Sequence, residues 1–292
     1  MKTILFLASL PLALLVMGML AIGGCGTAIH ENIAYFYPNW MVDGRIIAVK
    51  SFSTHRYEGL PGYGRDITIS SGNYLVTMKD DGSDEKIIYG GENIGDDNPV
   101  ASPLGNYVAC SSGKNLRIIT ADGAREIKTI NCNENLNSFD WSPDETKIAF
   151  SGADTKNLYI LNINNETITK IATNSADVAW RVGDKIAFGF LYTINSDGSN
   201  NNYLTDGGKP QILNSGKVLY FADFVSSGIY KIKSLYTTGT GEATSINAYE
   251  RGTLKLSFDN KKIVGGDSSQ GGFPSGIWVI NIDGTNQRKL RD

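Results

Sequence analysis

The sequence contains little of the material from which common catalytic and metal sites are built. Among its 292 residues are only two histidines and three cysteines, too few for most zinc centres or histidine-based catalytic sites. It also lacks a Gly-x-Ser-x-Gly segment, a phosphate-binding loop and a dinucleotide-binding signature, which disfavours hydrolases, NTPases and Rossmann dehydrogenases that carry those motifs. We therefore expect a protein that is not an enzyme and that has no catalytic residues, cofactor or metal ion.

Charge of either sign is also in short supply. Lys and Arg number 27 against 30 Asp and Glu, for a net charge of −3, and no basic stripe is present. Because phosphate binding needs clustered cations, nucleic acid is excluded as the main partner. Only eight prolines occur, whereas glycine is abundant at 33 residues. So many glycines indicate many tight turns, which favours an all-β fold.

The first residues have the form of an export signal. Met1 and Lys2 give a short positive start, and no charged residue occurs from Thr3 to Ile22. Two small residues, Gly23 and Gly24, then precede Cys25. A positive start, an apolar run and small residues before a cleavage position are typical of secretory signals. The Ile-Gly-Gly-Cys ending resembles a bacterial lipobox, which implies lipidation of Cys25 and insertion of its acyl chains into the lipid bilayer.

Two other interpretations of this segment remain: an uncleaved transmembrane anchor and a plain signal peptide with an incidental Cys25. All three export the rest of the chain. We predict a lipid-anchored protein of the outer membrane, the periplasmic face or the cell surface. Gly26 after the cysteine favours the outer membrane in a bacterium with two membranes.

The remainder is organised as six repeats. A turn that mostly ends in Asp-Gly recurs at intervals of 41, 42, 33, 43 and 43 residues, and we expect two-residue hairpins there. A second marker precedes each turn, clearest in Trp40–Val49, Trp141–Phe150 and Trp180–Phe188. Each unit therefore predicts four antiparallel strands, which is one blade of a β-propeller. The three tryptophans are expected to pack between blades, with a stacking platform for a sugar as the alternative.

The repeat resembles that of TolB-type propellers, the WD40-like PD40 family. The Trp141-Ser-Pro-Asp…Lys-Ile-Ala-Phe150 and Ile277–Leu290 segments carry the likeness, which extends over residues 37–292. It implies a six-bladed ring and brings no catalytic residue with it. We expect the chain to lack TolB's N-terminal α/β domain, because too few residues precede Trp40.

These patterns predict an all-β protein whose six-bladed β-propeller follows a lipoprotein signal segment. The expected divisions are a signal peptide (1–24), a linker (25–36) and a propeller (37–292), with blades at 37–94, 95–132, 133–173, 174–206, 207–247 and 248–292. How the ring closes stays open, because the sixth blade is complete without residues 29–36.

The longest connections mark a candidate binding face. Ser53–Asn73 is predicted to be a Gly-rich loop of blade one, and Asp267–Gly276 occupies the same slot in blade six. The ring brings these blades together, so we expect both loops on one face, beside the connection from blade one to blade two. His30 in the linker and His55 in the loop are not expected to be held by packing. The candidate partner or ligand residues are His55, Arg56, Tyr57, Tyr63, Arg65, Asp66, Asp96, Asp97 and Phe273.

Cys110 and Cys132 remain after lipidation of Cys25. An exported protein can join two such thiols in a disulfide. However, the strands that carry them are expected to lie about 9–10 Å apart, beyond the reach of a bridge unless the chain folds back. A disulfide and two separate thiols both remain open.

Three functions follow from these expectations. The first is a non-enzymatic scaffold that binds another protein of the cell envelope. The second is a propeller that binds carbohydrate or peptidoglycan, and the third is a glycan-directed hydrolase or lyase. Asn39, Asp140, Gln211 and Lys255 are the polar residues that the innermost strands offer to such a site.

Overall fold

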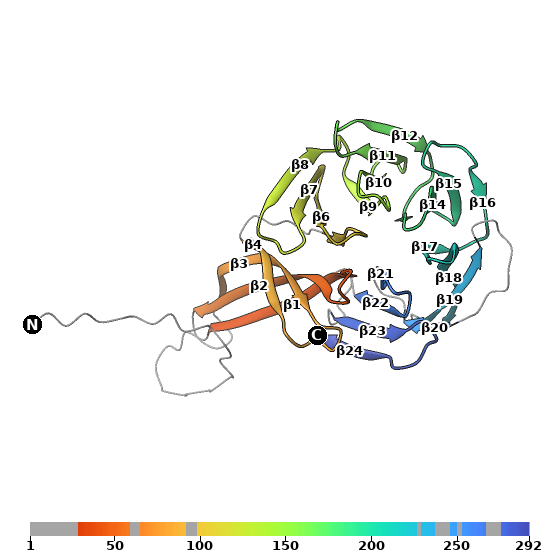
Figure 1. Cartoon of the computed structure of the whole chain (residues 1–292). Coiled ribbons are helices and arrows are strands. Elements are labelled where there is room, and N and C mark those ends of the chain that lie inside the picture. The colour runs from red at the N-terminus through yellow and green to blue at the C-terminus, as the bar shows by residue number, and fades with distance from the viewer. Residues whose placement is uncertain are drawn as a thin grey trace, which may run out of the picture.

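The computed structural model describes residues 29–58, 65–91, 98–226, 229–236, 246–249, 253–266 and 276–291. These residues form a six-bladed β-propeller (Figure 1), as predicted. Every blade is a sheet of four consecutive antiparallel strands. Within the described part of the chain, no helix is long and apolar enough to cross a membrane.

Each blade runs from its innermost to its outermost strand in chain order. Blade one consists of β1 (Ile29–Trp40), β2 (Ile46–Glu58), β3 (Arg65–Met78) and β4 (Lys86–Gly91). Blade two consists of β5 (Val100–Ala101), β6 (Tyr107–Ser112), β7 (Asn115–Thr120) and β8 (Glu126–Asn131). Blade three consists of β9 (Leu136–Trp141), β10 (Lys147–Gly152), β11 (Leu158–Asn162) and β12 (Ile168–Ala172).

The other three blades follow the same plan. Blade four consists of β13 (Val178–Ala179), β14 (Lys185–Phe188), β15 (Tyr192–Asn195) and β16 (Asn202–Tyr203). Blade five consists of β17 (Gly208–Ile212), β18 (Lys217–Ser226), β19 (Ile229–Tyr236) and β20 (Ile246–Tyr249). Blade six consists of β21 (Thr253–Leu256), β22 (Lys262–Gly266), β23 (Ile277–Asn281) and β24 (Arg288–Arg291).

Two of the expected boundaries need correction. Residues 29–36 are not part of a linker, because Ile29–Phe36 pairs in register with Val49–Arg56 as the first part of β1. The expected division between blades five and six at residue 247 falls inside β20. In both places the pairing of the strand backbone extends past the repeat that is visible in the sequence.

The Asp-Gly turns are longer than the expected two-residue hairpins. In the turn Lys79–Gly82 the glycine N–H donates to Lys79 O at 2.9 Å, and of these four residues only Gly82 has a positive φ, +82°. The carboxylate of Asp81 accepts a hydrogen bond from Ser83 N at 2.8 Å. This hydrogen bonding from Ser83 lowers the pKa of Asp81. Glycine is thus needed at the last position of the turn, where φ is positive.

One apolar cluster fills each of the six seams between adjacent blades. Trp40 and Trp141 are almost fully buried in two of these clusters. The Trp40 indole donates to Lys255 O of blade six, and the Trp141 indole donates to Val100 O of blade two. Trp180 is buried as well. The tryptophans are therefore interblade core, and their burial rules out the sugar platform.

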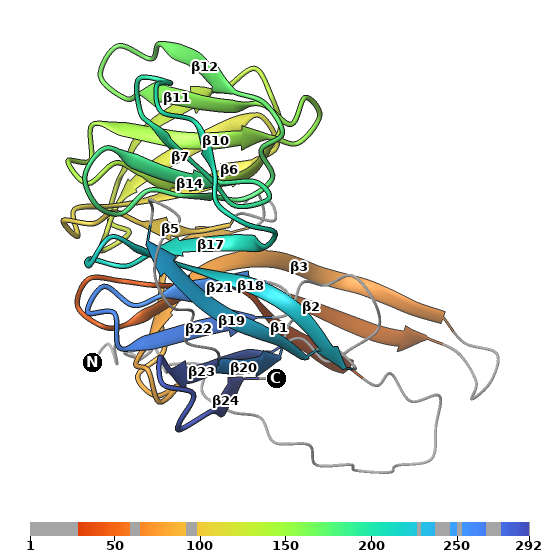
Figure 2. The ribbon, with the colours of Figure 1, turned by 90° about the vertical axis from the view of Figure 1, so that its right-hand side faces the viewer.

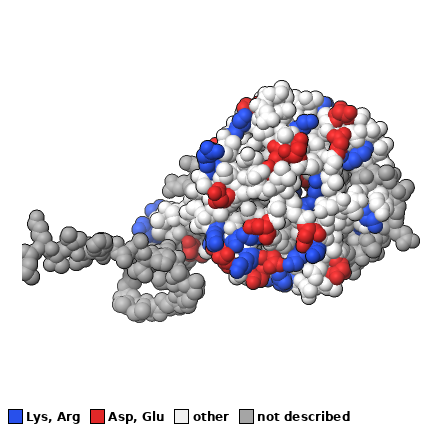
Figure 3. All heavy atoms as spheres, in the orientation of Figure 1, with Lys and Arg blue, Asp and Glu red and all other residues white. Residues whose placement is uncertain are grey.

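The ring closes through side chains, because blades one and six each keep their own four strands. Trp40, Ile46 and Val76 of blade one pack against Val264 and Ile277 of blade six. At the rim, Lys262 and Arg288 of blade six both pair with Asp80 of blade one. Figure 3 shows acidic and basic residues intermixed over this part of the surface.

Cys110 and Cys132 are both buried and unbridged. Cys110 packs with Ile47 and Val49 in the seam toward blade one, whereas Cys132 packs with Phe139 in the seam toward blade three. They therefore lie on opposite faces of the blade-two sheet, which separates the two sulfurs. Burial raises the pKa of the Cys132 thiol to about 11, so this thiol is protonated and unreactive at neutral pH.

Candidate binding face

Blade one extends well beyond the ring of stacked blades, which we call the wheel. The predicted loop at Ser53–Asn73 is wrong: β2 continues to Glu58 and β3 begins at Arg65, and the two strands pair along their length. With the start of β1 they form a three-stranded ribbon, defined as Ile29–Ala34, Ser51–Glu58 and Arg65–Asn73. Figure 2 shows it projecting from one face of the ring, and the β18–β19 hairpin of blade five extends toward the same side. The short Asp-Gly turns lie on the opposite face.

Several of the candidate residues lie on this ribbon. His55, Arg56 and Tyr57 are in β2, opposite Thr68, Ile67 and Asp66 of β3. Arg65 pairs with Glu58 at the last described step of the ladder. The remaining candidates lie outside the described residues: Tyr63, Asp96, Asp97 and Phe273, and with them the lipidation site Cys25.

One side of the ribbon gathers both histidines of the protein. His30 of β1 lies directly opposite His55 of β2, and their rings stack with centroids 5.2 Å apart. The Asp66 carboxylate is 3.8 Å from His30 Nε2, and Ser53 Oγ is 2.9 Å from His55 Nε2. The strand ladder thus positions the two rings, contrary to the expectation from sequence. We call this surface the histidine side.

The other side of the ribbon is more apolar, and we call it the isoleucine side. Alternation along paired strands places Ile29, Ile33 and Phe52 there together. Ile29 is 66% exposed and Ile33 44% exposed, while the Phe52 ring stacks on Tyr74 with centroids 5.2 Å apart. The isoleucine side therefore offers a partner several apolar groups that lie next to one another on one regular sheet.

The ribbon also presents unpaired strand edges. Ile29–Ala34 pairs only with β2 among the described strands. Residues 65–72 likewise pair only with β2, because β4 joins β3 from Asn73 onward. Each edge therefore carries backbone N–H and C=O groups that can pair with an added strand.

The axial channel opens on the same face as the ribbon. A cavity of about 130 Å³ lies at the start of the innermost strands and receives residues from all six blades. Its polar lining residues are Tyr37, Asn98, Asn137, Ser138, Asp177, Lys209, Gln211 and Lys255. Sequence reasoning found only Gln211 and Lys255. The signal for the others is their place at the beginning of each innermost strand, which the repeat alignment supplies.

Polar side chains below this cavity join the innermost strands in pairs. Asn39 Nδ2 donates to Pro99 O at 3.2 Å, from blade one to blade two. Asp140 accepts from Trp180 N at 2.9 Å, from blade three to blade four. Gln211 accepts from Leu256 N at 3.2 Å, from blade five to blade six. Three residues that the sequence offered as channel ligands are therefore engaged in holding the ring together.

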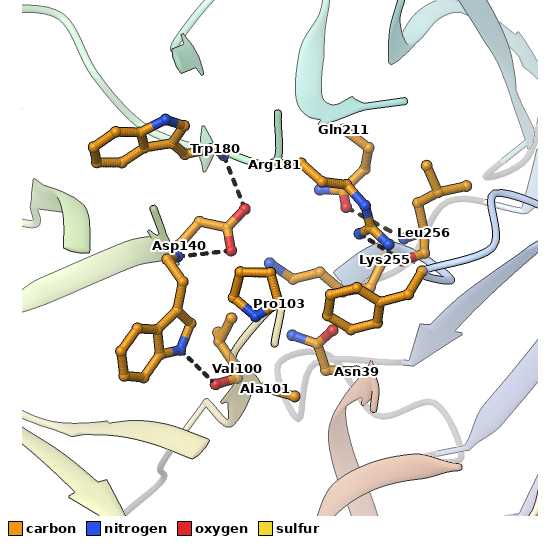
Figure 4. Close-up of a pocket in the computed structure, with 12 residues that line it drawn as sticks. Asn39, Val100, Ala101, Pro103, Asp140, Trp180, Arg181, Gln211, Lys255 and Leu256 are labelled. Atoms are coloured by element: carbon orange, nitrogen blue, oxygen red, sulfur yellow. Dashed lines mark hydrogen bonds between the residues drawn. The ribbon is translucent and has the colours of Figure 1, made fainter. Parts of the chain in front are cut away.

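Asp140 is the acidic centre of the channel (Figure 4). Desolvation by burial raises its pKa, although the positive charges of Lys255 and Arg181 and the hydrogen bonds from Trp180 N and Trp141 N act in the opposite direction. A carboxylate with a raised pKa can act as an acid or a base. Its oxygens already accept two backbone N–H groups, and the described residues contain no metal-binding group of three His, Cys, Asp or Glu side chains.

The comparisons with known proteins support the fold. Neither the protein-family models nor the curated proteins match the sequence. Among solved structures, TolB from Acinetobacter baumannii is 11% identical with a TM-score of 0.58, over 91% of this chain and 80% of that chain. A structure described as TolB from Agrobacterium tumefaciens is 17% identical with a TM-score of 0.56, over 70% and 83%.

An enzyme shares the same architecture. An oligogalacturonate lyase in complex with manganese is 15% identical with a TM-score of 0.53, over 90% of this chain and 78% of that chain. Likenesses at this level of identity show the architecture and leave the activity to be argued from the site. The chain is thus a six-bladed propeller similar in structure to both TolB proteins and a lyase.

Proposed function

We propose that this protein is a non-enzymatic binding scaffold of the cell envelope that recognises a protein partner with the face carrying the ribbon. The observation that carries the proposal is the continuation of β1, β2 and β3 beyond the wheel. Ile29 and Ile33 are exposed there, and two strand edges have no partner among the described strands. A sheet that extends past its own core is costly to leave exposed, and a partner strand satisfies both its apolar side and its edges.

The expected partner segment is extended and partly apolar. Added to the edge of β1 or β3, it pairs through its backbone. At the β1 edge its alternate side chains lie beside Ile29 and Ile33 on the isoleucine side. Both free edges belong to the ribbon, so the wheel itself need not change on binding. The fold shared with TolB proteins is compatible with this role.

Photocrosslinking tests the proposal directly. A photoreactive residue at position 33 is expected to crosslink to one discrete envelope protein in intact cells. The matched control is position 104, because Leu104 is 62% exposed and belongs to the opposite face. A crosslink of equal strength at both positions, or at position 104 alone, contradicts the assignment of the binding face. Purified partner and a peptide of its crosslinked segment then show whether binding adds a strand.

Membrane attachment belongs to the same proposal. We infer that Cys25 is lipidated and holds the propeller at an exported membrane surface. The Ile22-Gly23-Gly24-Cys25 segment supports this. Metabolic labelling with a fatty acid is expected to mark the wild type and not a Cys25→Ser variant, which should leave the membrane fraction. A Cys110→Ser variant controls for the loss of a thiol, and labelling of Cys25→Ser contradicts lipidation at this residue.

A glycan-directed activity is the second candidate, and the axial cavity is the observation that favours it. Lys209 and Lys255 line this cavity together with amide side chains, a combination that suits an acidic sugar. The volume of about 130 Å³ is below the range of about 300–1,000 Å³ typical of small-molecule pockets, which is why the scaffold is preferred. Release of unsaturated products from oligogalacturonate, abolished by Lys255→Met, would reverse that preference.

A further inference from the structure

Blade four closes the far end of the channel with an arginine where three other blades have a serine. Ser102, Ser142 and Ser257 occupy the equivalent position after the innermost strand and accept hydrogen bonds within their own turns. Arg181 instead reaches across the channel to blade six. Its Nη1 donates to Leu256 O at 3.1 Å, and its guanidinium group lies 4.3 Å from the centre of the Phe258 ring.

The opposite edge of this guanidinium group is buried. Arg181 Nε and Nη2 are both shielded from solvent, and no group of the described chain accepts a hydrogen bond from either. These two atoms lie on one edge of the planar group, so their N–H bonds point the same way, in the fork with which arginine holds an anion. Burying two such donors without an acceptor is unfavourable.

The nearby carboxylates do not satisfy this edge. Arg181 and Lys255 bring two positive charges to the channel, Asp140 lines the same cavity, and the charge of Asp259 also acts on Arg181. The Asp140 oxygens accept from Trp141 N and Trp180 N, so the carboxylate is held by the strands around it. Neither carboxylate accepts a hydrogen bond from Arg181 Nε or Nη2, so among the described residues these buried donors still lack an acceptor that an anion would supply.

The size of the space selects the counter-ion. The cavity at Arg181 has a volume of about 20 Å³, enough for one water-sized particle, which needs about 10–15 Å³. We propose that a monovalent, chloride-sized anion binds in the axial channel on the Nε and Nη2 edge of Arg181, between blades four and six. Sulfate, phosphate and sugar carboxylates are too large for this space.

Bromide is the probe that tests this site, because it replaces chloride and scatters anomalously. Crystals of the wild-type propeller grown in sodium bromide are expected to show an anomalous peak beside Arg181 Nε and Nη2. The peak should be lost in Arg181→Lys, which keeps the charge but not the fork. It should persist in Arg125→Lys, whose substitution lies in an exposed turn of blade two. A wild-type map with no peak at Arg181 overturns the proposal and leaves a water molecule as the occupant.

Thermal unfolding gives a second measurement that does not depend on the variants. At equal ionic strength, chloride and bromide are expected to raise the unfolding midpoint of the wild type by a few degrees relative to gluconate, which cannot enter the cavity. The increase should saturate as the halide concentration rises. Equal midpoints in chloride and gluconate contradict the proposal, even if Arg181→Lys does not fold.

Discussion

The two halves of the same strands in blade one have opposite surroundings. Inside the wheel, Ile46–Val49 of β2 and Leu75–Met78 of β3 are buried between neighbouring blades. Beyond the wheel, the same strands continue as the ribbon with their side chains half-buried or exposed. The ladder is continuous through both halves. Backbone pairing thus determines the shape of the ribbon, whereas burial between blades supplies the stability, which leaves the side chains of the ribbon free for recognition.

The largest loss of stability is expected from a tryptophan in the wheel. Trp141 is 1% exposed, packs against Tyr107 and donates to Val100 O. Trp141→Ala should therefore lower the free energy of unfolding by about 3–5 kcal/mol, measured by urea denaturation. The matched ribbon variant Phe52→Ala should lose much less, because Phe52 packs mainly on Tyr74. Equal losses would show that the ribbon contributes as much stability as the wheel.

An intermediate effect is expected where the ribbon meets the wheel. The carboxylate of Glu85 accepts from Tyr35 OH and Lys50 Nζ, both at 2.8 Å, and lies 3.5 Å from Arg291 of blade six. Burial alone would raise the pKa of Glu85. The hydrogen bonds from Lys50 and Tyr35 and the charges of Lys50 and Arg291 outweigh burial, and its pKa is lowered. This group therefore joins the base of the ribbon to the closing seam.

Glu85→Gln should lower the free energy of unfolding by about 1–3 kcal/mol at neutral pH. Because the folded pKa lies below the ordinary value of 4.5, the contribution of Glu85 is present above that value and is lost as the pH falls through the folded pKa. Wild type and variant should thus converge in acid, once the pH has fallen below the folded pKa. Glu166→Gln, which breaks the exposed pair with Lys128, should cost about 0–1 kcal/mol. If the difference in the free energy of unfolding between wild type and Glu85→Gln persisted in acid, it would contradict the charge-based account.

The same comparison explains what the sequence could and could not predict. The wheel follows from local repeats: Trp40 and Trp141 mark the ends of innermost strands, and Asp-Gly marks the turns. The ribbon depends on a partner that lies earlier in the chain. Ser53–Asn73 looks like a loop because of its glycines, and its strands become evident only when Ile29–Phe36 pairs beside them.

The residues that depart from the repeat were also missed. Arg181 stands where three other blades have serine, and in the sequence it is only one mismatch within a clear copy of the repeat. Its importance comes from the closed ring, which places Leu256 and Phe258 of blade six within its reach. Cys110 and Cys132 show the same limit, because the seam that each thiol faces depends on strand pairing. Contacts across the channel and between blades are set by the whole ring.

A substitution on the isoleucine side of the ribbon should change stability least and partner binding most. Ile33 of β1 and Ile47 of β2 belong to the same blade, but Ile33 is 44% exposed on the ribbon and Ile47 is fully buried in the seam toward blade two. Ile33→Ser should therefore lower the free energy of unfolding by less than about 1 kcal/mol, whereas Ile47→Ser should lower it by about 2–5 kcal/mol.

If the isoleucine side is the recognition surface, Ile33→Ser also weakens binding to the crosslinked partner at least tenfold in titration calorimetry, and Leu104→Ser on the opposite face leaves binding unchanged. Full affinity in Ile33→Ser would move recognition to the histidine side or to the axial cavity. In that case His55→Ala and Lys209→Met, one on each surface, identify which of the two contacts the partner.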